Sequence, residues 1–462
     1  MKGNYIMFDK VILNGNIVFP GRNIIQGNIG IKNGKIVNIT DVFTRIEGYE
    51  NIDAKEKYVL PGVIEPHSHI GIGAGELDLI TETRSAALGG VSTVLFFLRE
   101  NTPYDQIYEK VKDIGNKNSY IDFSFHIVLI TEEHLKNIPK YIEEYGITSF
   151  KHYFTYRGED AVTTNFGGNP IKFKSIDDGY ILESFQMLSN YPKAVAIVHA
   201  ENIEIVQRAV KRLKNRGKDD LESWAASRPP IAEAEIVRRA LFFAENAGCK
   251  INILHLTSEL ALKEALMHRK RYKNIFIEVC HPYLLFNEND VDSKKFKVRP
   301  PIRTRKDNVA LWEAVKRGDI NTVGSDHVPR KLKSKMGSIW SKIAGIAGTP
   351  YLLPIILNEG YHKRGIPLTK ITKLLSLNPA QLYGLYPRKG DIIIGGDADL
   401  VIVDLKKEYL LSSQDIKQFS DFTLYDKYKA KGYPELTMVR GNVVAEKGSV
   451  VGKSGWGNFI SR

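Results

Sequence analysis

Residues 60–69, LPGVIEPHSH, mark the point where the periodicity of the chain changes. Before them, short alternating stretches are broken by Gly and Asn, the pattern of hairpins in a small β domain. After them, an apolar strand followed by an amphipathic helix is repeated many times, which indicates parallel βα units. Within this stretch, we interpret GVIEPHSH (62–69) as the first strand of the repeat, and it ends in His67 and His69.

Eight apolar segments beyond residue 60 have the composition of buried strands. Amphipathic stretches of helical period separate them, for example 233–248 and 259–270. Eight parallel strands alternating with helices favour a closed (β/α)8 barrel of the TIM type, although a doubly wound open sheet has a similar local pattern. The expected strands are GVIEPHSH (62–69), STVLFF (92–97), IDFSFHIVLI (121–130), ITSFKHYF (147–154), AVAIVHA (194–200), INILHL (251–256), IFIEVC (275–280) and INTVGSD (320–326).

Short strands return near the end of the chain, at DADLVIVDL (397–405) and ELTMVRGNVVAE (435–446). We therefore expect a small β-sandwich built from both chain ends, with the barrel inserted between its halves. The expected domains are 1–60, the first part of the sandwich; 61–384, the barrel; and 385–462, the second part of the sandwich with an oligomerisation tail.

Composition excludes several classes of protein. The formal charge of +12 would suit a nucleic-acid binder only if the basic residues were clustered, but the runs 211–218, 268–273 and 330–335 are far apart. No apolar run reaches the ~18 residues of a membrane-spanning helix. With only two cysteines, Cys249 and Cys280, and no secretory leader pattern, we expect a reduced, cytoplasmic compartment without nucleic-acid or membrane partners.

Ionisable residues at the ends of the expected strands form the candidate site. In a (β/α)8 barrel the loops after the strands meet at one mouth. His67 and His69, two residues apart, lie on the same side of a strand and can bind one metal ion. A single histidine is more often a hydrogen-bonded core residue, but ligand types at five strand ends together predict a metal site. The other four are Lys151, His199, His255 and Asp326.

At these residues the chain resembles the cyclic-amidase branch of the amidohydrolase superfamily, which holds dihydropyrimidinases (hydantoinases), allantoinases and dihydroorotases. This branch has a metal-binding barrel and a β-sandwich from both termini, so the resemblance implies the same fold as the pattern above. The matching segments run almost end to end: LPGVIEPHSH (60–69), AALGGVSTV (86–94), GITSFKHYFTY (146–156), VHAEN (198–202), SRPPIAEAEIVRRA (227–240), ILHLTS (253–258), EVCHPYLLF (278–286), RPPIR (299–303), GSDHVP (324–329), NPAQLYGLYPRKGDIIIGGDADLVIVD (378–404) and GWGNF (455–459).

The resemblance implies two divalent metal ions in each subunit. His67, His69 and Asp326 would bind the first, and His199 and His255 the second. Zinc is the leading metal because imidazole and carboxylate ligands suit it, while manganese, iron or cobalt stay open.

The resemblance also implies roles in the reaction for three residues. Lys151 would be carboxylated by carbon dioxide, and its carbamate would bridge both metals. Asp326 would serve as proton shuttle, and Tyr156 would hydrogen-bond the developing oxyanion.

The expected activity is therefore hydrolysis of a cyclic amide or ureide ring (EC 3.5.2) by a metal-bridging hydroxide, with a small cyclic amide as substrate. A hydantoinase or dihydropyrimidinase is the leading prediction, followed by allantoinase and then a dihydroorotase-like enzyme. The non-enzyme alternative is a catalytically inactive scaffold protein of the same fold. The family is commonly oligomeric, so we expect a homodimer or homotetramer.

Two positions depart from the family pattern. Dihydroorotases usually carry an arginine two residues after the second histidine, where this chain has Gly71. Arg299 precedes the Pro-Pro pair, where hydantoinases tend to have Ser and allantoinases or dihydroorotases Asn. Arg299 is a candidate substrate-binding residue for an extra carbonyl or carboxylate; the alternative is that its side chain turns away into an ion pair.

Overall fold

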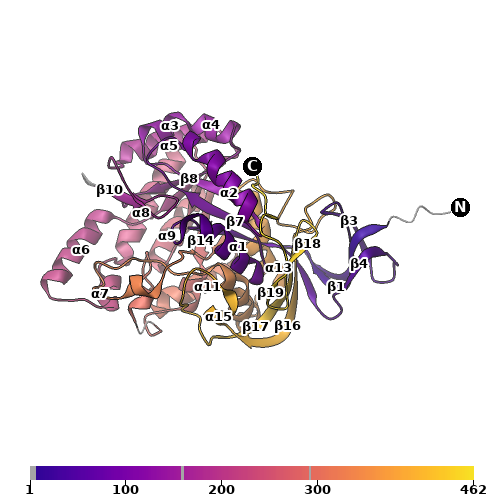
Figure 1. Cartoon of the computed structure of the whole chain (residues 1–462). Helices are drawn as coiled ribbons and strands as arrows, with labels where there is room; N and C mark the ends of the chain where they lie inside the picture. The colour runs from indigo at the N-terminus through magenta and orange to yellow at the C-terminus, as the bar shows by residue number, and fades with distance from the viewer. Residues whose placement is uncertain (1–6, 158–160, 291–292) are drawn as a thin grey trace.

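A computed structural model of the chain describes residues 7–157, 161–290 and 293–462 (Figure 1). Two large sheets and one hairpin account for the strands within these ranges. The hairpin joins β10 (Ala161–Thr164) to β11 (Pro170–Phe173) after the fourth barrel strand.

Eight parallel strands form the barrel sheet, and they are the eight that the sequence predicts. They follow one another in chain order, without the reversal of strand order that a doubly wound sheet requires. The barrel prediction is therefore confirmed, and the doubly wound alternative is wrong. The strands are β6 (Val63–Ser68), β7 (Val91–Leu98), β8 (Asp122–Val128), β9 (Ser149–Tyr153), β12 (Val195–His199), β13 (Ile251–Ile253), β14 (Ile275–Cys280) and β15 (Thr322–Gly324).

The first and last strands meet through backbone hydrogen bonds and one buried carboxylate. The amide of His69 donates to the carbonyl of His327 at 2.8 Å, and the amide of His327 donates to the carbonyl of His67 at 3.3 Å. Glu65 Oε1 accepts from the amides of His67 and Ser325 at 2.9 and 3.1 Å. Burial raises the pKa of Glu65 to about 7. This seam brings the β6 histidines next to the loop after β15.

Helices surround the barrel, and local sequence sets their ends. A capping box of Thr304 and Asp307 begins α11, and Gly248, with φ 75°, ends α8. The longer helices are α1 (Asp78–Leu88), α2 (Tyr108–Asn118), α5 (Asp178–Ser189), α6 (Ile203–Asn215), α8 (Pro230–Ala247), α9 (Glu259–Arg271) and α11 (Arg305–Arg317). Shorter ones are α3 (Glu132–Lys136), α4 (Ile138–Glu143), α7 (Leu221–Ala226), α10 (His281–Leu285), α12 (Leu352–Ile356), α13 (Leu368–Thr372), α14 (Asn378–Leu382) and α15 (Ser413–Ile416).

Both chain ends contribute to the second sheet, as the sequence predicts. Its two parts are joined by antiparallel pairing of β5 with β16, and the yellow strands lie beside the indigo ones in Figure 1. A separate apolar core lies against this sheet and combines residues such as Ile17 and Leu400 from the two ends. The boundaries at 60 and 385 stay predictions. The strands are β1 (Phe8–Val18), β2 (Ile24–Lys32), β3 (Lys35–Asp41), β4 (Gly48–Asp53), β5 (Tyr58–Pro61), β16 (Leu400–Leu410), β17 (Lys429–Val439), β18 (Asn442–Glu446) and β19 (Ser449–Val450).

A buried ionic cluster joins the second sheet to the base of the barrel, where β8 begins. We call it the base cluster; it comprises Asp122, Lys389, Asp397, Asp399 and Arg440. Lys389 Nζ lies 2.7 Å from Asp122, 3.1 Å from Asp397 and 2.5 Å from Asp399. Arg440 forms an ion pair with Asp122. Each carboxylate therefore contacts at least one cation.

The segment 455–462 packs against the base of its own barrel. The amide of Ile460 donates to the carbonyl of Phe123 at 2.8 Å, and Arg462 Nη1 donates to Ser149 Oγ at 2.8 Å. Its contribution to an oligomer stays a prediction.

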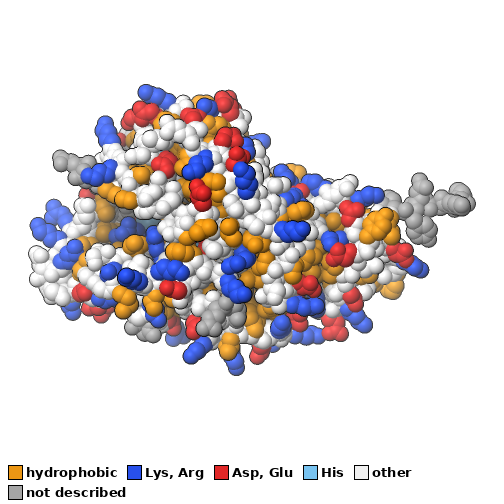
Figure 2. Space-filling view, viewed as in Figure 1, with side chains coloured by type: hydrophobic (Ala, Val, Ile, Leu, Met, Phe, Trp, Pro, Cys, Tyr) orange, Lys and Arg blue, Asp and Glu red, His pale blue; other side chains and the backbone are white. Residues whose placement is uncertain are grey.

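Charged residues of both signs alternate over the molecular face in Figure 2, without a single large basic patch on that face. Among the described residues, no helix has both the length and the apolar character needed to cross a membrane.

Candidate metal centre

The six predicted ligands meet at the mouth of the barrel. A cavity of about 350 Å³ opens there, and five of the six line it. The sixth, His67, is fully buried, with its ring centroid 5.6 Å from that of His69 and 5.3 Å from that of His255. The lining ligands are His69, Lys151, His199, His255 and Asp326.

His67, His69 and Asp326 form the first group of donor atoms. Asp326 Oδ1 lies 3.1 Å from His67 Nε2 and 3.3 Å from His69 Nε2. Burial alone would raise the pKa of Asp326, but the two imidazoles hold it well below its usual range. An ionised carboxylate and two imidazole nitrogens around one point are ligands that suit a divalent cation.

His199 and His255 form the second group. His199 Nδ1 and His255 Nε2 face each other at 2.9 Å. Burial, together with the neighbouring His199, lowers the pKa of His255 well below its ordinary value. Burial also lowers the pKa of His199. The neutral imidazole is the form that binds metals, so both side chains are in a suitable state.

Lys151 lies beside these groups with its side chain enclosed. Its Nζ is 4.8 Å from the centroid of Phe97 and 4.9 Å from that of Tyr153. Burial lowers the pKa of Lys151 to about 7, although the carboxylate of Asp326 opposes the shift. A substantial fraction of the amine is therefore unprotonated near neutral pH.

The adjacent His152 lies on the other face of β9, as strand alternation predicts. Its Nε2 is 2.7 Å from Ser184 Oγ, and its ring contacts Phe185, both on α5. His152 thus packs between strand and helix, whereas Lys151 faces the mouth.

Two of the predicted ligands have a strained backbone. His255 has φ 33° and Asp326 has φ 50°, in the left-handed region that residues with a side chain rarely adopt. Such strain persists where the surrounding structure imposes it and is frequent at functional sites.

Comparison with known proteins identifies the family of this centre. Residues 58–444 match the amidohydrolase family. The chain belongs to that family. The L-hydantoinase of Paenarthrobacter aurescens is 31% identical, and the alignment covers 99% of this chain and 98% of the relative. The allantoinase of Deinococcus radiodurans is 29% identical, with 96% of each chain covered.

A solved structure confirms the fold of this amidohydrolase. The dihydropyrimidinase from Brevibacillus agri superposes with a TM-score of 0.90 at 26% identity, covering 98% of both chains. The prediction of an enzyme in the cyclic-amidase branch is confirmed by these similarities.

Two carboxylates, which the sequence analysis missed, orient histidines of the amidohydrolase centre. Glu278 Oε1 lies 2.6 Å from His67 Nδ1, and Glu201 Oε2 lies 2.9 Å from His199 Nε2. Each carboxylate accepts a hydrogen bond from its histidine, which turns His67 Nε2 toward Asp326 and His199 Nδ1 toward His255. Arg228 Nη1 in turn donates to Glu201 at 2.8 Å. In the sequence, the one indication of this role for Glu201 is its position two residues after His199.

The predicted oxyanion donor, Tyr156, lies at the mouth and lines the cavity. Its hydroxyl is 2.8 Å from Thr163 Oγ1 on β10, and its ring centroid is 4.5 Å from that of Tyr153. The hairpin β10–β11 thereby fixes the side chain that is predicted to act on the substrate.

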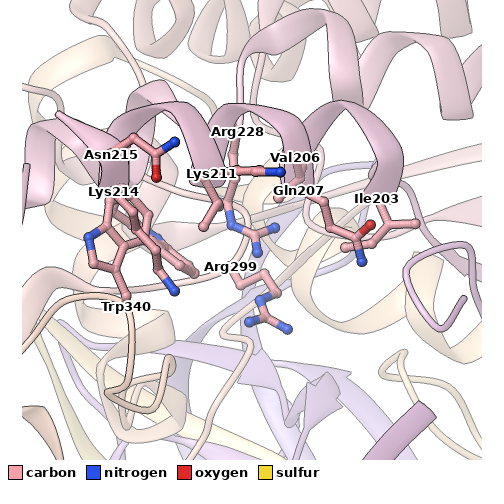
Figure 3. Close-up of a pocket in the computed structure, with 11 residues that line it drawn as sticks. Ile203, Val206, Gln207, Lys211, Lys214, Asn215, Arg228, Arg299 and Trp340 are labelled. Atoms are coloured by element: carbon pink, nitrogen blue, oxygen red, sulfur yellow. The ribbon is translucent and has the colours of Figure 1, made fainter. Parts of the chain in front are cut away.

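Arg299 lies between two hollows of the surface. It lines the metal cavity and also a groove along α6, where its side chain lies below Arg228 and near Trp340 (Figure 3). Its Cζ is 5.8 Å from the centroid of Trp224. Among the described residues it has no carboxylate within 4.0 Å, so these residues supply no partner for the ion-pair alternative. A role in substrate binding stays a prediction.

Gly71 departs from the dihydroorotase pattern for a packing reason. It has φ 95°, and a Cβ there would lie 2.3 Å from Cδ2 of Phe166 on the hairpin loop. The amide of Gly167 also donates to its carbonyl at 2.7 Å. A side chain as large as arginine therefore does not fit at this position.

Proposed function

We propose that the protein is a metal-dependent hydrolase that opens a cyclic amide or ureide ring, as hydantoinases and dihydropyrimidinases do. The observation that supports this most is the convergence of two groups of ligand atoms beside Lys151 at the barrel mouth. Hydantoinases about 30% identical over nearly the whole chain support the choice of reaction. Allantoinase is the second candidate, because an allantoinase is similar over nearly the same length; a dihydroorotase-like activity comes third.

The donor atoms fit two divalent cations. His67 Nε2 has no hydrogen-bond partner in the structure, although it is buried, and it lies against Asp326. His199 Nδ1 and His255 Nε2 point at each other across one hydrogen bond, and a cation bound by both nitrogens would replace the shared hydrogen. Zinc is the proposed metal, because these nitrogen and oxygen ligands suit it. When bound, the cations would polarise the scissile carbonyl and lower the pKa of a water molecule.

Lys151 is proposed to act as a carbamate. Its unprotonated Nζ would form a bond to the carbon of carbon dioxide and lose one proton, which leaves a carboxylate at the end of the side chain. An ammonium group would repel two divalent cations, whereas the carbamate has one negative charge and two oxygens that can reach both. The lowered pKa of Lys151 favours the amine form that this step requires.

Asp326 and Tyr156 are proposed to move a proton and to stabilise charge. The side chain of Asp326 is 14% exposed, so the carboxylate remains accessible from the cavity. It would take a proton from the attacking water and return it to the ring nitrogen as the C–N bond breaks. The hydroxyl of Tyr156 would leave Thr163 and donate to the carbonyl oxygen as negative charge develops there.

Metal analysis and a panel of rings test the proposal together. Protein purified without chelator should contain about two metal ions per chain if the fit to two cations is right. It should open at least one of hydantoins, dihydrouracil, allantoin, dihydroorotate and cyclic imides, and a chelator should abolish the activity. Clearly less than one metal ion per chain, together with no ring opening after zinc is added, would overturn the proposal.

The compartment and the assembly are part of the proposal. Cys249 and Cys280 are buried free thiols, which is consistent with a reducing cytoplasm. A homodimer or homotetramer is proposed, and light scattering of the purified protein would determine the number of subunits.

A further inference from the structure

The cavity beside the metal centre is lined by an excess of positive charge. Asp326 is the one carboxylate among the described residues that line it, and it already lies against His67 and His69. Besides Lys151, four side chains with a permanent or usual positive charge share the same lining: Arg99, Arg299, Arg330 and Lys342. Two of them, Arg99 and Arg330, extend from the segments that follow β7 and β15.

Arg99 is buried, and none of the described carboxylates forms an ion pair with it. Its residue is 7% exposed, its Nη1 donates to the carbonyl of Thr164 at 3.1 Å, and its Nη2 donates to the hydroxyl of Tyr153 at 2.9 Å. Its Nε has no hydrogen-bond partner, and no carboxylate of the described residues lies within 4.0 Å of the group. A buried cation without a counter-charge is costly, so such a group indicates a missing anion.

Arg330 is half-buried and lies on the other side of the seam between β6 and the segment after β15. Its Nη1 donates to the carbonyl of Ile72 at 3.2 Å, and its Nε has no hydrogen-bond partner among the described residues. Burial and the like charge of Arg99 lower the pKa of Arg330 to about 10. The nearby carboxylate of Asp78 accepts from the amides of loop 71–74. It therefore does not neutralise the guanidinium directly.

Other buried arginines near the mouth do have acidic partners. Arg228 lies 2.8 Å from Glu201, and Arg303 lies 3.8 Å from Glu233. Among the described residues, Arg99 and Arg330 differ from these two arginines of the mouth, because no carboxylate lies within 4.0 Å of either.

We propose that the ring substrate carries a carboxylate-type substituent, and that Arg99 and Arg330 bind this anion while the ring amide lies at the metal centre. The inference rests on the proposed function. Guanidinium groups match a planar carboxylate with paired N–H donors, and both arginines retain a free Nε. Ile72 and Val162 line the same cavity and would contact the methylene groups between ring and carboxylate.

A matched pair of hydantoins tests the charge alone. The substituent 2-carboxyethyl is negative, and 2-carbamoylethyl has almost the same size without charge. We expect kcat/KM for the acid to exceed that for the amide by about 10- to 100-fold, because hydrogen bonds to a charged group are stronger than neutral ones. Arg330→Gln and Arg99→Gln should each bring this ratio towards one. Lys333→Gln removes the same charge from an exposed position and should leave the ratio unchanged.

Binding provides a second readout that does not require turnover. Calorimetry with the metal-loaded protein should show tighter binding of the carboxyethyl ring, with an advantage that falls as salt increases and is lost in Arg330→Gln. Kd values and kcat/KM values within twofold for the two rings would overturn the inference. Opening of the neutral ring under those conditions would leave the proposed function standing. Preferential binding of the acid without opening of any ring would support the inference and count against the proposed reaction.

Discussion

Both ends of the barrel bury charged residues, but among the described residues only those of the base cluster are all paired with an opposite charge. At the base, Lys389 lies within 3.1 Å of three carboxylates and Arg440 pairs with one of them. At the mouth, Arg99 and Arg330 have no acidic partner among the residues that the structure describes, and histidine nitrogens face each other. Complete pairing indicates a structural role, whereas incomplete pairing of buried groups indicates a binding site.

The base cluster shows why residue type alone does not identify a metal site. Asp122, Asp397 and Asp399 are close enough to bind one cation. The ammonium group of Lys389 already lies between them and holds the pKa of Asp397 below its usual range, against the effect of burial. His67, His69 and Asp326 at the mouth are also close enough to bind one cation. Among the described residues, no lysine forms an ion pair with Asp326.

The largest effect is expected from Lys151→Ala, which removes the proposed bridging ligand at the mouth. Loss of an interaction of several kcal/mol should lower kcat/KM by about 10³-fold or more. Steady-state kinetics and metal analysis would measure this, and a small carboxylic acid should restore part of the activity. The neighbouring variant His152→Asn changes a side chain that faces α5 and serves as control. Full activity of Lys151→Ala without added acid would contradict the carbamate.

Lys389→Met should have the largest effect at the base. Removing one partner from a buried ionic cluster should lower the free energy of unfolding by about 3 to 5 kcal/mol. The kcat/KM of the folded protein should stay near the parental value, because the cluster lies at the opposite end of the barrel. Denaturant unfolding would measure the change. Lys406→Met, in an exposed ion pair with Glu56, should change stability by less than about 1 kcal/mol. Equal stability losses in the two variants would contradict a structural role for the base cluster.

Tyr156→Phe should weaken catalysis without emptying the metal centre. Loss of one oxyanion donor lowers kcat by about 10²- to 10³-fold in other enzymes, and we expect the same range here. The metal content should remain parental, and the exposed variant Tyr49→Phe should behave as the parent. A kcat within threefold of the parent would show that Tyr156 does not stabilise the oxyanion.

The smallest of the four effects is expected from Glu278→Gln. The amide can still accept from His67 Nδ1, but it lacks the charge that makes the imidazole a stronger ligand. Metal affinity should fall by about 10- to 100-fold. Competition with a chelator would measure it, with Glu76→Gln on the surface as control. Unchanged affinity would mean that Glu278 serves packing alone.

The barrel strands could be predicted because most are buried on both faces. β7, for example, is apolar over nearly its whole length and buried at all eight positions. The hairpin β10–β11 was missed, since AVTT and PIKF are short and partly polar. Its position depends on contacts of Phe166 with Gly71, which are about a hundred residues apart and leave no periodic signal.

The candidate ligands could be predicted because each ends a strand, and strand ends meet at one mouth. Their supporting partners could not. Glu278 reaches His67 across 211 residues of sequence, and only the closed barrel brings them together. Arg99 looks like an ordinary surface charge after a strand; its burial and its missing partner are properties of the folded cavity.

The pairing of β5 with β16 has a consequence for the synthesis of the protein. About 340 residues lie between Pro61 and Leu400. At ~5 to 20 residues per second a ribosome needs roughly 20 to 70 s to add them. Until then one edge of β5 has no partner, whereas each barrel strand pairs with the next barrel strand in chain order. We therefore expect the terminal sheet to be completed after the barrel, and translation that stalls before residue 400 should leave an open strand edge prone to aggregation.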